Sequence, residues 1–351
     1  MEQLSFYRGK RVFVTGHTGF KGGWLCRTLA LAGAEVFGYS LPPQGALSYC
    51  ELCAVGETVR GVFGDVRDHG ALRAALCDFS PEVVFHLAAQ PIVGRGYREP
   101  LATFDVNLLG TVSLLEAVRA CPSVKSVLVV TTDKVYRAGR GARSERAPLG
   151  GGDPYSASKA CAEIAADCYR TSWLAEEGVA LSTARAGNAI GGGDFGEGRL
   201  VPDFFRAAES GQPLSLRDPR SVRPYQFVLE PVSAYLRIAA AQAEDPSLAG
   251  AYNVGPAAGA RTAQLVGFLS EAWGGARWQR GKAPFREAEK LELDSGKVER
   301  VFGIRPRTDL SDAVQLTVAW ERARLSGADM AQFSDGQIAS FFARPMLQDK
   351  T

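Results

Sequence analysis

Residues 11–22 read RVFVTGHTGFKG, and this stretch joins an apolar run to the start of a helix-like segment. It places Gly16, Gly19 and Gly22 in the turn and at the head of the helix. Glycines there permit a tight turn and a close backbone approach, and the helix N-terminus presents free N–H groups to a pyrophosphate. The spacing is GxxGxxG, and a chain with 39 glycines can produce such a triplet by chance. The strand–turn–helix context favours a dinucleotide-binding turn over a purely structural one.

Beyond this turn, short apolar runs alternate with longer helix-like segments. Most of the runs are continuously apolar, which is typical of parallel strands buried on both faces. The predicted strands are Arg11–Thr15, Glu35–Ser40, Val59–Phe63, Val83–Leu87, Val127–Thr131 and Ala180–Ala186. The predicted helices include Trp24–Ala32, His69–Cys77, Ala102–Ala120 and Ser156–Ala175. This alternation predicts an α/β fold with a doubly wound parallel sheet of the Rossmann type, whose ligand crevice lies at the carboxyl ends of the strands.

The composition and the pattern of predicted elements change after Gly187. Residues 187–224 are rich in Gly, Pro and Arg, and a helix-like run (Glu230–Ala243) and a short strand (Gly250–Val254) follow. A chain of 351 residues is also long for a single core. We therefore expect a cofactor domain and a smaller, partly interleaved C-terminal α/β substrate domain. The expected cofactor domain is 1–186 plus about 226–256, and the expected substrate domain is about 187–225 plus 257–351.

Composition limits the class of protein. The 40 basic and 38 acidic residues give a net charge of +2, so no general attraction for nucleic acid or anionic membranes is expected. A hydrophobic share of 46% excludes wholesale disorder. No stretch is expected to span a bilayer and the start lacks the features of a signal peptide, so the expected location is the cytoplasm. Of seven cysteines only Cys50 and Cys53 form a CxxC pair, and no metal site is expected.

The choice of dinucleotide depends on the end of the second strand, which reads Gly38-Tyr39-Ser40-Leu41. A carboxylate there usually binds the ribose hydroxyls of NAD, and an arginine suits NADP. Neither is present, and the missing cation favours NAD. Asp65, after the third strand, could accept a hydrogen bond from the adenine amine or could cap the next helix, and both interpretations stay open.

Tyr155 and Lys159 have the YxxxK spacing, which places both on one face of a helix. A lysine beside a tyrosine is expected to lower the pKa of the phenol by stabilising the phenolate. The tyrosine could then act as general base on a sugar or alcohol hydroxyl while a nicotinamide takes the hydride. Alone, this spacing would indicate an exposed helix pair, but together with the upstream glycine turn it favours catalysis.

Four polar residues, Thr131 to Lys134, follow the apolar run at 127–130. Thr132 is placed to hydrogen-bond a substrate hydroxyl, and Asp133 and Lys134 add a carboxylate and an amine at the same mouth of the sheet. A simple dehydrogenase or 4-epimerase needs no second acid/base pair. An elimination does, because a carbon-bound proton must leave and a hydroxyl must be protonated. The alternative is a strand-end salt bridge.

These motifs, in this order, resemble the extended short-chain dehydrogenase/reductase family over nearly the whole chain. The segments that carry the resemblance are TGHTGFKG (15–22), GDVRD (64–68), FHLAAQP (85–91), TTDK (131–134), DPYSASK (153–159), GNAIGGGD (187–194) and RPYQFVLEP (223–231). Within the family they most resemble the CDP-glucose 4,6-dehydratases, which convert CDP-glucose to CDP-4-keto-6-deoxyglucose with bound NAD.

The resemblance implies roles for individual residues. Tyr155, assisted by Lys159, would take the C4 hydroxyl proton while Thr132 hydrogen-bonds the C4 oxygen. Lys134 would abstract the C5 proton and Asp133 would protonate the departing C6 hydroxyl. The residues implied in NAD binding are Gly16, Thr18, Gly19, Phe20, Gly22, Asp65, Val66, Leu87, Ala88, Ala89, Asn107, Tyr155 and Lys159. Those implied in substrate binding are Gln90, Asn188, Arg199, Arg223 and Gln226; without the resemblance, the two arginines would be assigned to the surface.

The chain departs from the usual pattern at three places. The stretch at 93–97 reads VGRGY, with its arginine shifted by one place, the stretch at 223–227 reads RPYQF, and 286–288 reads REA. These departures keep open a dehydratase or epimerase acting on another nucleotide sugar, and a catalytically silent NAD-binding sensor is the alternative of another class. The family also implies a homodimer in which 102–120 and 156–175 pair across a two-fold axis; the alternative is ordinary packing against the sheet.

Overall fold

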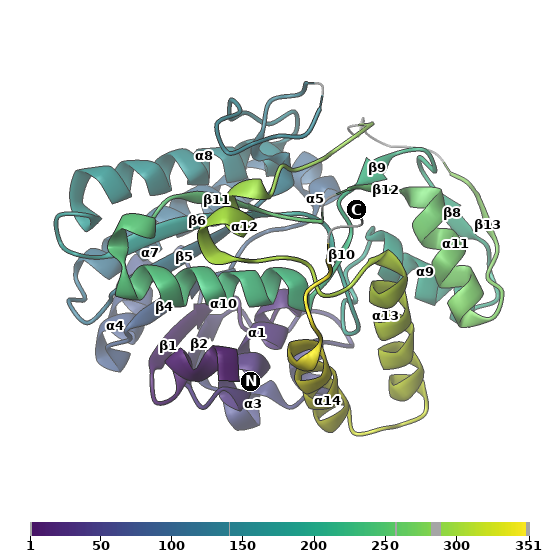
Figure 1. Ribbon diagram of the computed structural model, residues 1–351, viewed down its shortest axis with the longest axis horizontal. Coiled ribbons are helices and arrows are strands. Elements are labelled where there is room, and N and C mark those ends of the chain that lie inside the picture. The colour runs from purple at the N-terminus through teal and green to yellow at the C-terminus, as the bar shows by residue number, and fades with distance from the viewer. Residues whose placement is uncertain (1, 140, 257, 282–288, 349–351) are drawn as a thin grey trace.

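A computed structural model describes residues 2–139, 141–256, 258–281 and 289–348. Its centre is a seven-stranded, wholly parallel sheet in the order β11-β6-β5-β4-β1-β2-β3 (Figure 1). The strands are β1 (Arg11–Thr15), β2 (Glu35–Ser40), β3 (Arg60–Phe63), β4 (Val83–His86), β5 (Ser126–Thr132), β6 (Ala180–Ala186) and β11 (Ala251–Val254). The strand order reverses between β1 and β4, which is where a doubly wound sheet binds its ligand.

Alternate residues of the strands enter two separate cores. Val12 and Val14 of β1 pack into a cluster with α1 and α10, whereas Phe13 packs into a cluster with α4, α7 and α8. These helices are α1 (Phe20–Leu31), α10 (Leu229–Glu244), α4 (His69–Phe79), α7 (Gly110–Arg119) and α8 (Pro154–Tyr169). Strands β4, β5 and β6 are buried at every residue, and β1 at every residue but the first, because helices cover both faces of the sheet. The edge strand β3 is exposed at every residue, so the expectation of burial on both faces is wrong there: β3 has a neighbour on one side only.

Two predicted helices contain a wider π turn. The predicted helix 102–120 is a continuous run of α6 (Pro100–Phe104), η2 (Asp105–Leu109) and α7, and the predicted helix 156–175 is α8 followed by η4 (Arg170–Leu174). The run Pro100–Arg119 passes a membrane-span test by length and composition alone, so the expectation that no stretch would do so is wrong. It packs on α4 and α8, and 44% of its most apolar stretch is buried. These contacts place the run in the helical layer that covers one face of the sheet.

The second half of the chain builds a smaller lobe beside the carboxyl ends of the strands, on the right in Figure 1. Its main helices are α9 (Leu200–Glu209), α11 (Thr262–Trp273) and α13 (Leu310–Leu325), and α14 (Met330–Ala343) packs against α1 and α13. Its paired strands are β7 (Ala189–Ile190) with β10 (Gln226–Phe227), β9 (Val222–Arg223) with β12 (Ala260–Arg261), and β8 (Leu214–Leu216) with β13 (Trp278–Arg280). The remaining elements are η1 (Glu2–Tyr7), α2 (Tyr49–Leu52), α3 (Val55–Thr58), α5 (Val93–Arg98), η3 (Asp133–Val135), η5 (Pro246–Leu248) and α12 (Gly296–Phe302).

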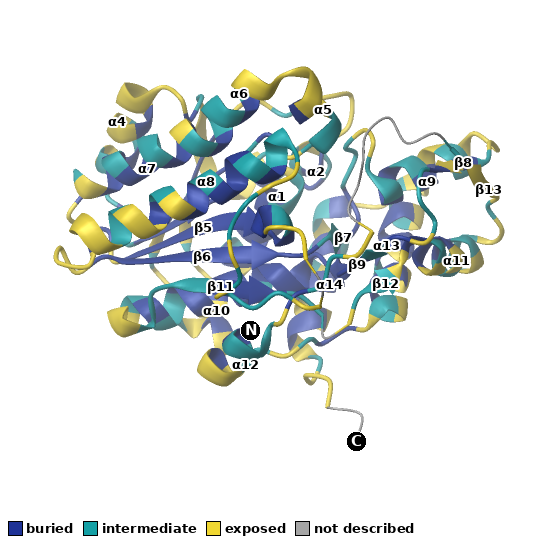
Figure 2. Cartoon of the chain, turned by 90° about the horizontal axis from the view of Figure 1, so that it is seen from above, coloured by how far each residue is buried: buried dark blue, intermediate teal, exposed yellow. Residues whose placement is uncertain are grey.

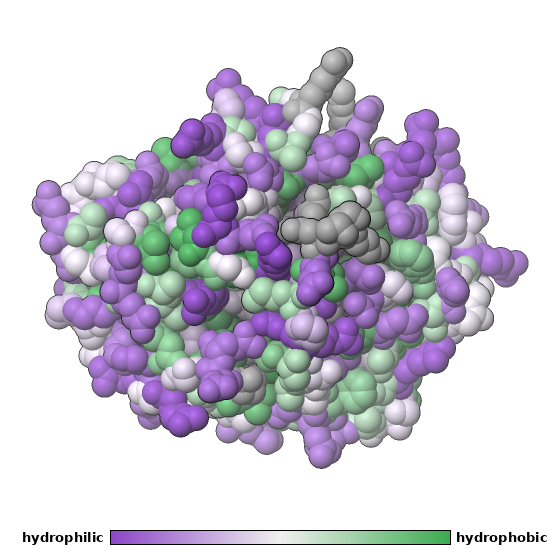
Figure 3. All heavy atoms as spheres, in the orientation of Figure 1, coloured by the Kyte–Doolittle hydropathy of each residue, from purple (hydrophilic) through white to green (hydrophobic). Residues whose placement is uncertain are grey.

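Buried aromatic residues join the lobe to the sheet. Trp24 Nε1 donates to the carbonyl of Gly192 at 3.0 Å, and Tyr49 lies between the rings of Trp24 and Trp320. Trp320 Nε1 in turn donates to Ser334 Oγ at 2.9 Å. A Cβ on Gly192 would lie 2.0 Å from Trp320 Cγ, so the glycine is needed for this contact. Outside such cores, polar side chains cover most of the face shown in Figure 3 and apolar residues form only small patches.

Trp320→Ala is expected to destabilise the protein by about 3–5 kcal/mol, because it empties a fully buried site that holds both lobes together. Urea unfolding followed by circular dichroism measures this loss. Trp278→Ala removes the same side chain from an exposed strand and serves as the matched control, expected to cost much less. Equal losses in the two variants would contradict the structural role given to Trp320.

Candidate active site

The glycine turn between β1 and α1 approaches the loop after β4 more closely than side chains would allow. Gly16 has a φ of +77°, and a Cβ on it would lie 2.7 Å from Ala88 N. A Cβ on Gly22 would lie 2.0 Å from the Gly16 carbonyl oxygen. Gly19 is the N-cap of α1 and supplies no side-chain hydrogen bond, which leaves the first-turn N–H groups available to an anion. Leu87, Ala88 and Ala89 follow β4 directly beside this turn. The arrangement fits the pyrophosphate of a dinucleotide.

The ends of β2 and β3 lie beside the same turn. Thr18 Oγ1 is 2.9 Å from Ser40 Oγ and donates to the carbonyl of Leu41 at 2.9 Å. The carboxylate of Asp65 accepts hydrogen bonds of 2.6–3.0 Å from the Arg67 guanidinium, which holds the pKa of that carboxyl below its usual value. Asp65 is not the helix cap that one interpretation of the sequence suggested: Asp68 caps α4 by accepting from Ala71 N at 3.0 Å.

Asn107, in the π turn η2, connects the loop after β4 to the helix α8. Its Oδ1 accepts from Gln90 N at 2.8 Å, and its Nδ2 donates to Gln90 O at 3.1 Å and to Ser158 Oγ at 2.9 Å. The side chain of Gln90 is itself bound to Thr103 Oγ1 and to the backbone N–H of Ile92. Asn107 thus fixes the residue next to Lys159. Val66, predicted to contact the cofactor, is buried and lies against Gly110.

Tyr155 and Lys159 lie on the first turns of α8, at the carboxyl edge of the sheet. The helix begins with Pro154 after the N-cap Asp153, whose carboxylate accepts from Ser156 N at 3.0 Å. Lys159 is buried, and its Nζ donates to the Val130 carbonyl of β5 at 3.1 Å. Burial, followed by the charge of Lys21, lowers the pKa of Lys159 to about 8.

Burial raises the pKa of Tyr155 to about 12, against a smaller lowering by a hydrogen bond with Thr132. The expectation that Lys159 would lower this pKa is therefore wrong. The physical reason is that the phenol is buried, and the Lys159 ammonium donates to a backbone carbonyl instead.

Thr132, Asp133 and Lys134 meet Tyr155 at the end of β5. Thr132 Oγ1 donates to Asp133 Oδ1 at 2.9 Å, and Lys134 Nζ lies 6.0 Å from the centre of the Tyr155 ring. Asp133 Oδ2 is buried and lacks a hydrogen-bond partner among the described residues, and burial raises the pKa of Asp133. Within that part of the chain Asp133 forms no ion pair, so the alternative of a strand-end salt bridge is not observed. An orphaned buried carboxyl is costly, and such a group is typical of a functional site.

The arginines predicted to bind a diphosphate reach this centre from the smaller lobe. Arg199, at the N-cap of α9, donates to both carboxylate oxygens of Asp194 at 2.9 and 3.0 Å, and its charge lowers the pKa of Tyr155. Arg223 is buried, so the surface assignment is wrong for it, and its charge lowers the pKa of Asp133. Asn188 O accepts from Gln226 N at 2.9 Å, and Gln226 Nε2 donates to Val254 O at 3.1 Å.

The three departures from the family pattern have different surroundings. Gly96 lies under Tyr155, since a Cβ on it would be 3.3 Å from Tyr155 N, whereas Arg95 forms an ion pair with Glu99. Phe227 is fully buried between the rings of Trp24 and Phe341. The stretch 286–288 lies outside the described residues.

Sequence reasoning missed Lys21. The charge of Asp133 raises its pKa and that of Arg199 lowers it, and burial, the largest effect, leaves it at about 8. In the sequence Lys21 is only one residue of the glycine motif, and its proximity to Asp133 follows from the tertiary fold. The described residues contain no group of three or more His, Cys, Asp or Glu side chains placed to hold a metal ion.

Gly22→Ala is expected to weaken NAD binding by about tenfold or more, because the added methyl would collide with the Gly16 carbonyl and push α1 from the turn. Isothermal titration calorimetry measures the affinity. Gly267→Ala makes the same change inside α11, where a Cβ meets nothing within 4 Å, and should leave NAD affinity unchanged. Unaltered binding in Gly22→Ala would show that this turn does not hold the cofactor.

Comparison with known proteins agrees with this geometry. The model of the NAD dependent epimerase/dehydratase family matches residues 12–255. A CDP-glucose 4,6-dehydratase of Salmonella typhimurium is 40% identical, over 98% of this chain and 99% of its own length. A dTDP-glucose 4,6-dehydratase of Streptomyces griseus is 31% identical, over 88% of this chain and 93% of its own.

Among solved structures, a dTDP-glucose 4,6-dehydratase of Streptomyces venezuelae with NAD and TYD bound superposes with a TM-score of 0.78. It is 28% identical, and the match covers 91% of this chain and 98% of that one. A UDP-glucose 4-epimerase of Thermus thermophilus in complex with NAD is 29% identical, with a TM-score of 0.76 over 88% of this chain and 98% of that one. The predicted doubly wound fold is confirmed.

Proposed function

Because this chain belongs to the NAD-dependent epimerase/dehydratase family, we propose that it is a nucleotide-sugar 4,6-dehydratase that converts CDP-glucose to CDP-4-keto-6-deoxyglucose. The observation that carries the proposal is the buried, unpartnered Oδ2 of Asp133 beside Lys134 and Tyr155. A 4-epimerase needs one proton acceptor at C4. A 4,6-elimination also needs a base for C5 and an acid for the C6 hydroxyl, and Lys134 and Asp133 supply that pair.

NAD is the cofactor, and when bound it supplies a hydride acceptor for C4 and a hydride donor for C6. The residues that would hold it are those of the glycine turn, the ends of β2 and β3 and the loop after β4. The cradle fits the group, since side chains at positions 16 and 22 would fill the space next to the helix N-terminus. Asn107 would fix the backbone on which the nicotinamide end rests.

The protein's own residues divide the proton transfers. Tyr155 would accept the C4 hydroxyl proton, next to the Lys159 ammonium and with Thr132 bonded to the C4 oxygen. The resulting ketone acidifies the C5 proton, which Lys134 would remove. Asp133 would then protonate the leaving C6 hydroxyl, and its raised pKa favours the protonated form that a general acid requires.

The smaller lobe would bind the nucleotide. Arg199 and Arg223 can make charge-assisted hydrogen bonds to the diphosphate, and Asn188, Gln226 and Gln90 line the same region. We propose the domain division accordingly: 1–186 with about 226–256 for the cofactor, and about 187–225 with 257–351 for the nucleotide sugar. The CDP-glucose relative, which matches across both parts, supports cytidine as the base.

The test is incubation of the purified protein with CDP-, UDP-, dTDP- and GDP-glucose, followed by mass spectrometry. Loss of one water from CDP-glucose alone is expected. In deuterated water the product should gain one deuterium, because C5 is reprotonated from solvent. Water loss from another of these compounds would reassign the base, and no loss from any of them would refute the dehydratase proposal.

Lys134→Ala is expected to lower kcat for water loss by about 10³-fold, since the C5 base is gone, with CDP-glucose affinity close to that of the wild type. Tyr155→Phe should abolish turnover before C5 is touched. Lys125→Ala is the matched control: Lys125 is exposed and precedes the same strand β5 that Lys134 follows. Its kcat should equal that of the wild type, and a wild-type rate for Lys134→Ala would remove Lys134 from the mechanism.

We also propose that the protein is a homodimer of the cytoplasm. The run α6–η2–α7 packs on α8, and both carry exposed residues on their outer side (Figure 2). Among these residues Leu101, Leu109 and Ile164 are 76%, 53% and 59% exposed. A second copy related by a two-fold axis would cover these side chains, as the family resemblance implies. All seven cysteines are free, which suits a reducing compartment.

The double variant Leu101→Glu/Ile164→Glu is expected to sediment as a monomer, because it places charge in the apolar contact between copies. Leu325→Glu, which alters an exposed leucine at the end of α13, should remain a dimer. Analytical ultracentrifugation distinguishes the two. A double variant that stays dimeric would show that the subunits pair elsewhere.

A further inference from the structure

A buried acid one turn beyond Lys159 has no part in the proton transfers described above. Glu163 is 3% exposed, and it follows Lys159 by four residues on α8, a spacing that brings Cβ atoms to about 5–6 Å. Acids are almost never fully buried unless they are paired. Its place beneath the catalytic lysine therefore calls for a physical account.

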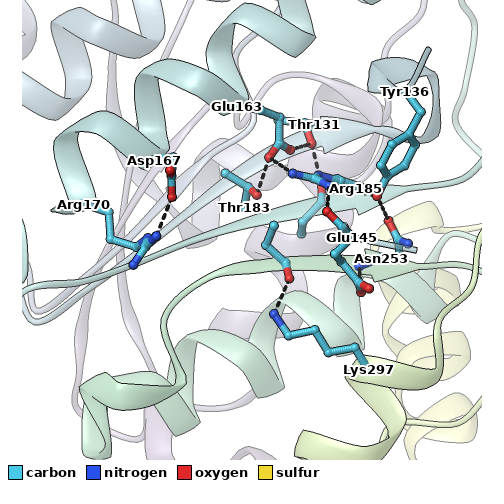
Figure 4. A network of polar contacts seen from close by, with 12 residues as sticks. Thr131, Tyr136, Glu145, Glu163, Asp167, Arg170, Thr183, Arg185, Asn253 and Lys297 are labelled. Atoms are coloured by element: carbon cyan, nitrogen blue, oxygen red, sulfur yellow. Dashed lines mark hydrogen bonds and ion pairs between the residues drawn. The ribbon is translucent and has the colours of Figure 1, made fainter. Parts of the chain in front are cut away.

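Glu163 is held by three neighbours that the sheet brings together (Figure 4). Arg185 Nη2 of β6 lies 2.8 Å from its Oε2, Thr183 Oγ1 donates to the same oxygen at 2.7 Å, and Thr131 Oγ1 donates to Oε1. Thr131 and Arg185 are directly opposite one another in the parallel pair of β5 and β6. Both oxygens of the carboxylate are thus occupied by donors from β5 and β6.

Arg185 is fixed in turn from the far side. Its Nη1 donates to Tyr136 Oη at 2.9 Å and to the carbonyl of Glu145 at 3.1 Å, and its guanidinium lies 5.1 Å from the centre of the Tyr136 ring. Tyr136 Oη donates to Asn253 Oδ1 of β11 at 2.5 Å. The Glu163 carboxylate consequently cannot move toward or away from Lys159 without breaking a network that spans β5, β6 and β11.

Adjacent residues of β5 hold adjacent turns of α8. The carbonyl of Val130 accepts from Lys159 Nζ, while the hydroxyl of the next residue, Thr131, donates to Glu163. Two consecutive residues of β5 therefore hold the ammonium of Lys159 and the carboxylate of Glu163. We propose that Glu163 is a positioning residue that keeps Lys159 in its ammonium form beside Tyr155.

The charges around Lys159 can be named for each element that packs on it. Burial and the charge of Lys21 of α1 lower the pKa of Lys159, and the charge of Glu163 of α8 raises it. His86 of β4 is buried beside Lys159, whose charge helps to lower the pKa of His86 to about 3, so His86 is neutral. Tyr155 shares the helix and is un-ionised, with its pKa at about 12. The negative charge of Glu163 accordingly opposes the lowering of the Lys159 pKa by burial and by Lys21.

The inference rests on the proposed function, in which the Lys159 ammonium assists Tyr155. Without Glu163 the pKa of Lys159 should fall, so the ammonium would be lost at a lower pH. Activity should then fall at a lower pH on the alkaline side of the profile, while activity well below the pKa stays near the wild-type value. A purely structural role would lower activity at every pH by the same factor.

The experiment is a pH titration of Lys159 in the full chain, with ¹³Cε-labelled lysine observed by NMR. The signal is assigned by its absence from Lys159→Arg, which separates it from Lys21. Glu163→Gln is expected to lower the midpoint by about one pH unit from the wild-type value near 8. The alkaline limb of kcat/KM for CDP-glucose should move in the same direction by a similar amount.

Asp167→Asn is the matched control, since it removes the same charge one turn further along α8, from an exposed side chain that pairs with Arg170. It should leave the midpoint and the pH profile unchanged. An unchanged midpoint in folded Glu163→Gln would overturn the inference. A wild type that fails to dehydrate any nucleotide sugar refutes the proposed function instead, and the NMR titration still decides the role of Glu163.

Glu163→Gln leaves Arg185 unpaired, which can prevent folding. The double variant Glu163→Met/Arg185→Met replaces the buried pair by apolar side chains of similar size, an exchange that buried ion pairs often tolerate. Because Glu163 is the member of the pair whose charge acts on Lys159, the midpoint should fall in this variant too. A folded double variant with the wild-type midpoint would overturn the inference equally.

Discussion

The hydrogen bond between Lys159 Nζ and the carbonyl of Val130 is the contact on which the arrangement of the site depends. It joins the first turns of α8 to the carboxyl end of β5. Tyr155, one turn before Lys159, then faces Thr132 and Lys134, which follow Val130 on the strand. An ammonium can occupy this buried position only because the carbonyl and Glu163 compensate its lost hydration. Because the buried Lys159 ammonium requires these partners, its position relative to β5 and Tyr155 is fixed.

Burial also sets the electrostatics of the groups around that contact. It raises the pKa values of Asp133 and Tyr155 and lowers those of Lys159 and Lys21. Each shift favours the neutral form of its group, and Glu163 opposes that effect at Lys159. The raised pKa of Tyr155 makes a nearby cation necessary for the phenol to accept the C4 proton, and the Lys159 ammonium would be that cation.

The sequence predicts what depends on local pattern. The ranges Arg11–Thr15, Glu35–Ser40 and Ala180–Ala186 agree with β1, β2 and β6 to the residue, because continuous apolar runs flanked by glycine and polar turns have one solution in a covered parallel sheet. The edge strand β3 has the same pattern but not the same burial, since a strand's position in the sheet is not written in its own residues. Contacts between segments distant in the sequence could not be predicted either, because they depend on how the elements are arranged in space. Glu163 lies in α8 and Arg185 in β6, with η4 between them. Arg185 lies just before the GNAIGGGD motif, but Glu163 forms part of no motif quoted above.

The departures at Gly96 and Phe227 show that deviation from a family motif has no uniform meaning. Phe227 sits in the core between Trp24 and Phe341, so a change there repacks the junction of the lobes and need not touch a ligand. Gly96 lies beneath the backbone of Tyr155, where any side chain would press on the start of α8. Its effect would be exerted on the position of the phenol relative to C4 of the sugar. Of the two, Gly96 is therefore the departure that bears on the chemistry, whereas the shifted Arg95 forms an exposed ion pair with Glu99.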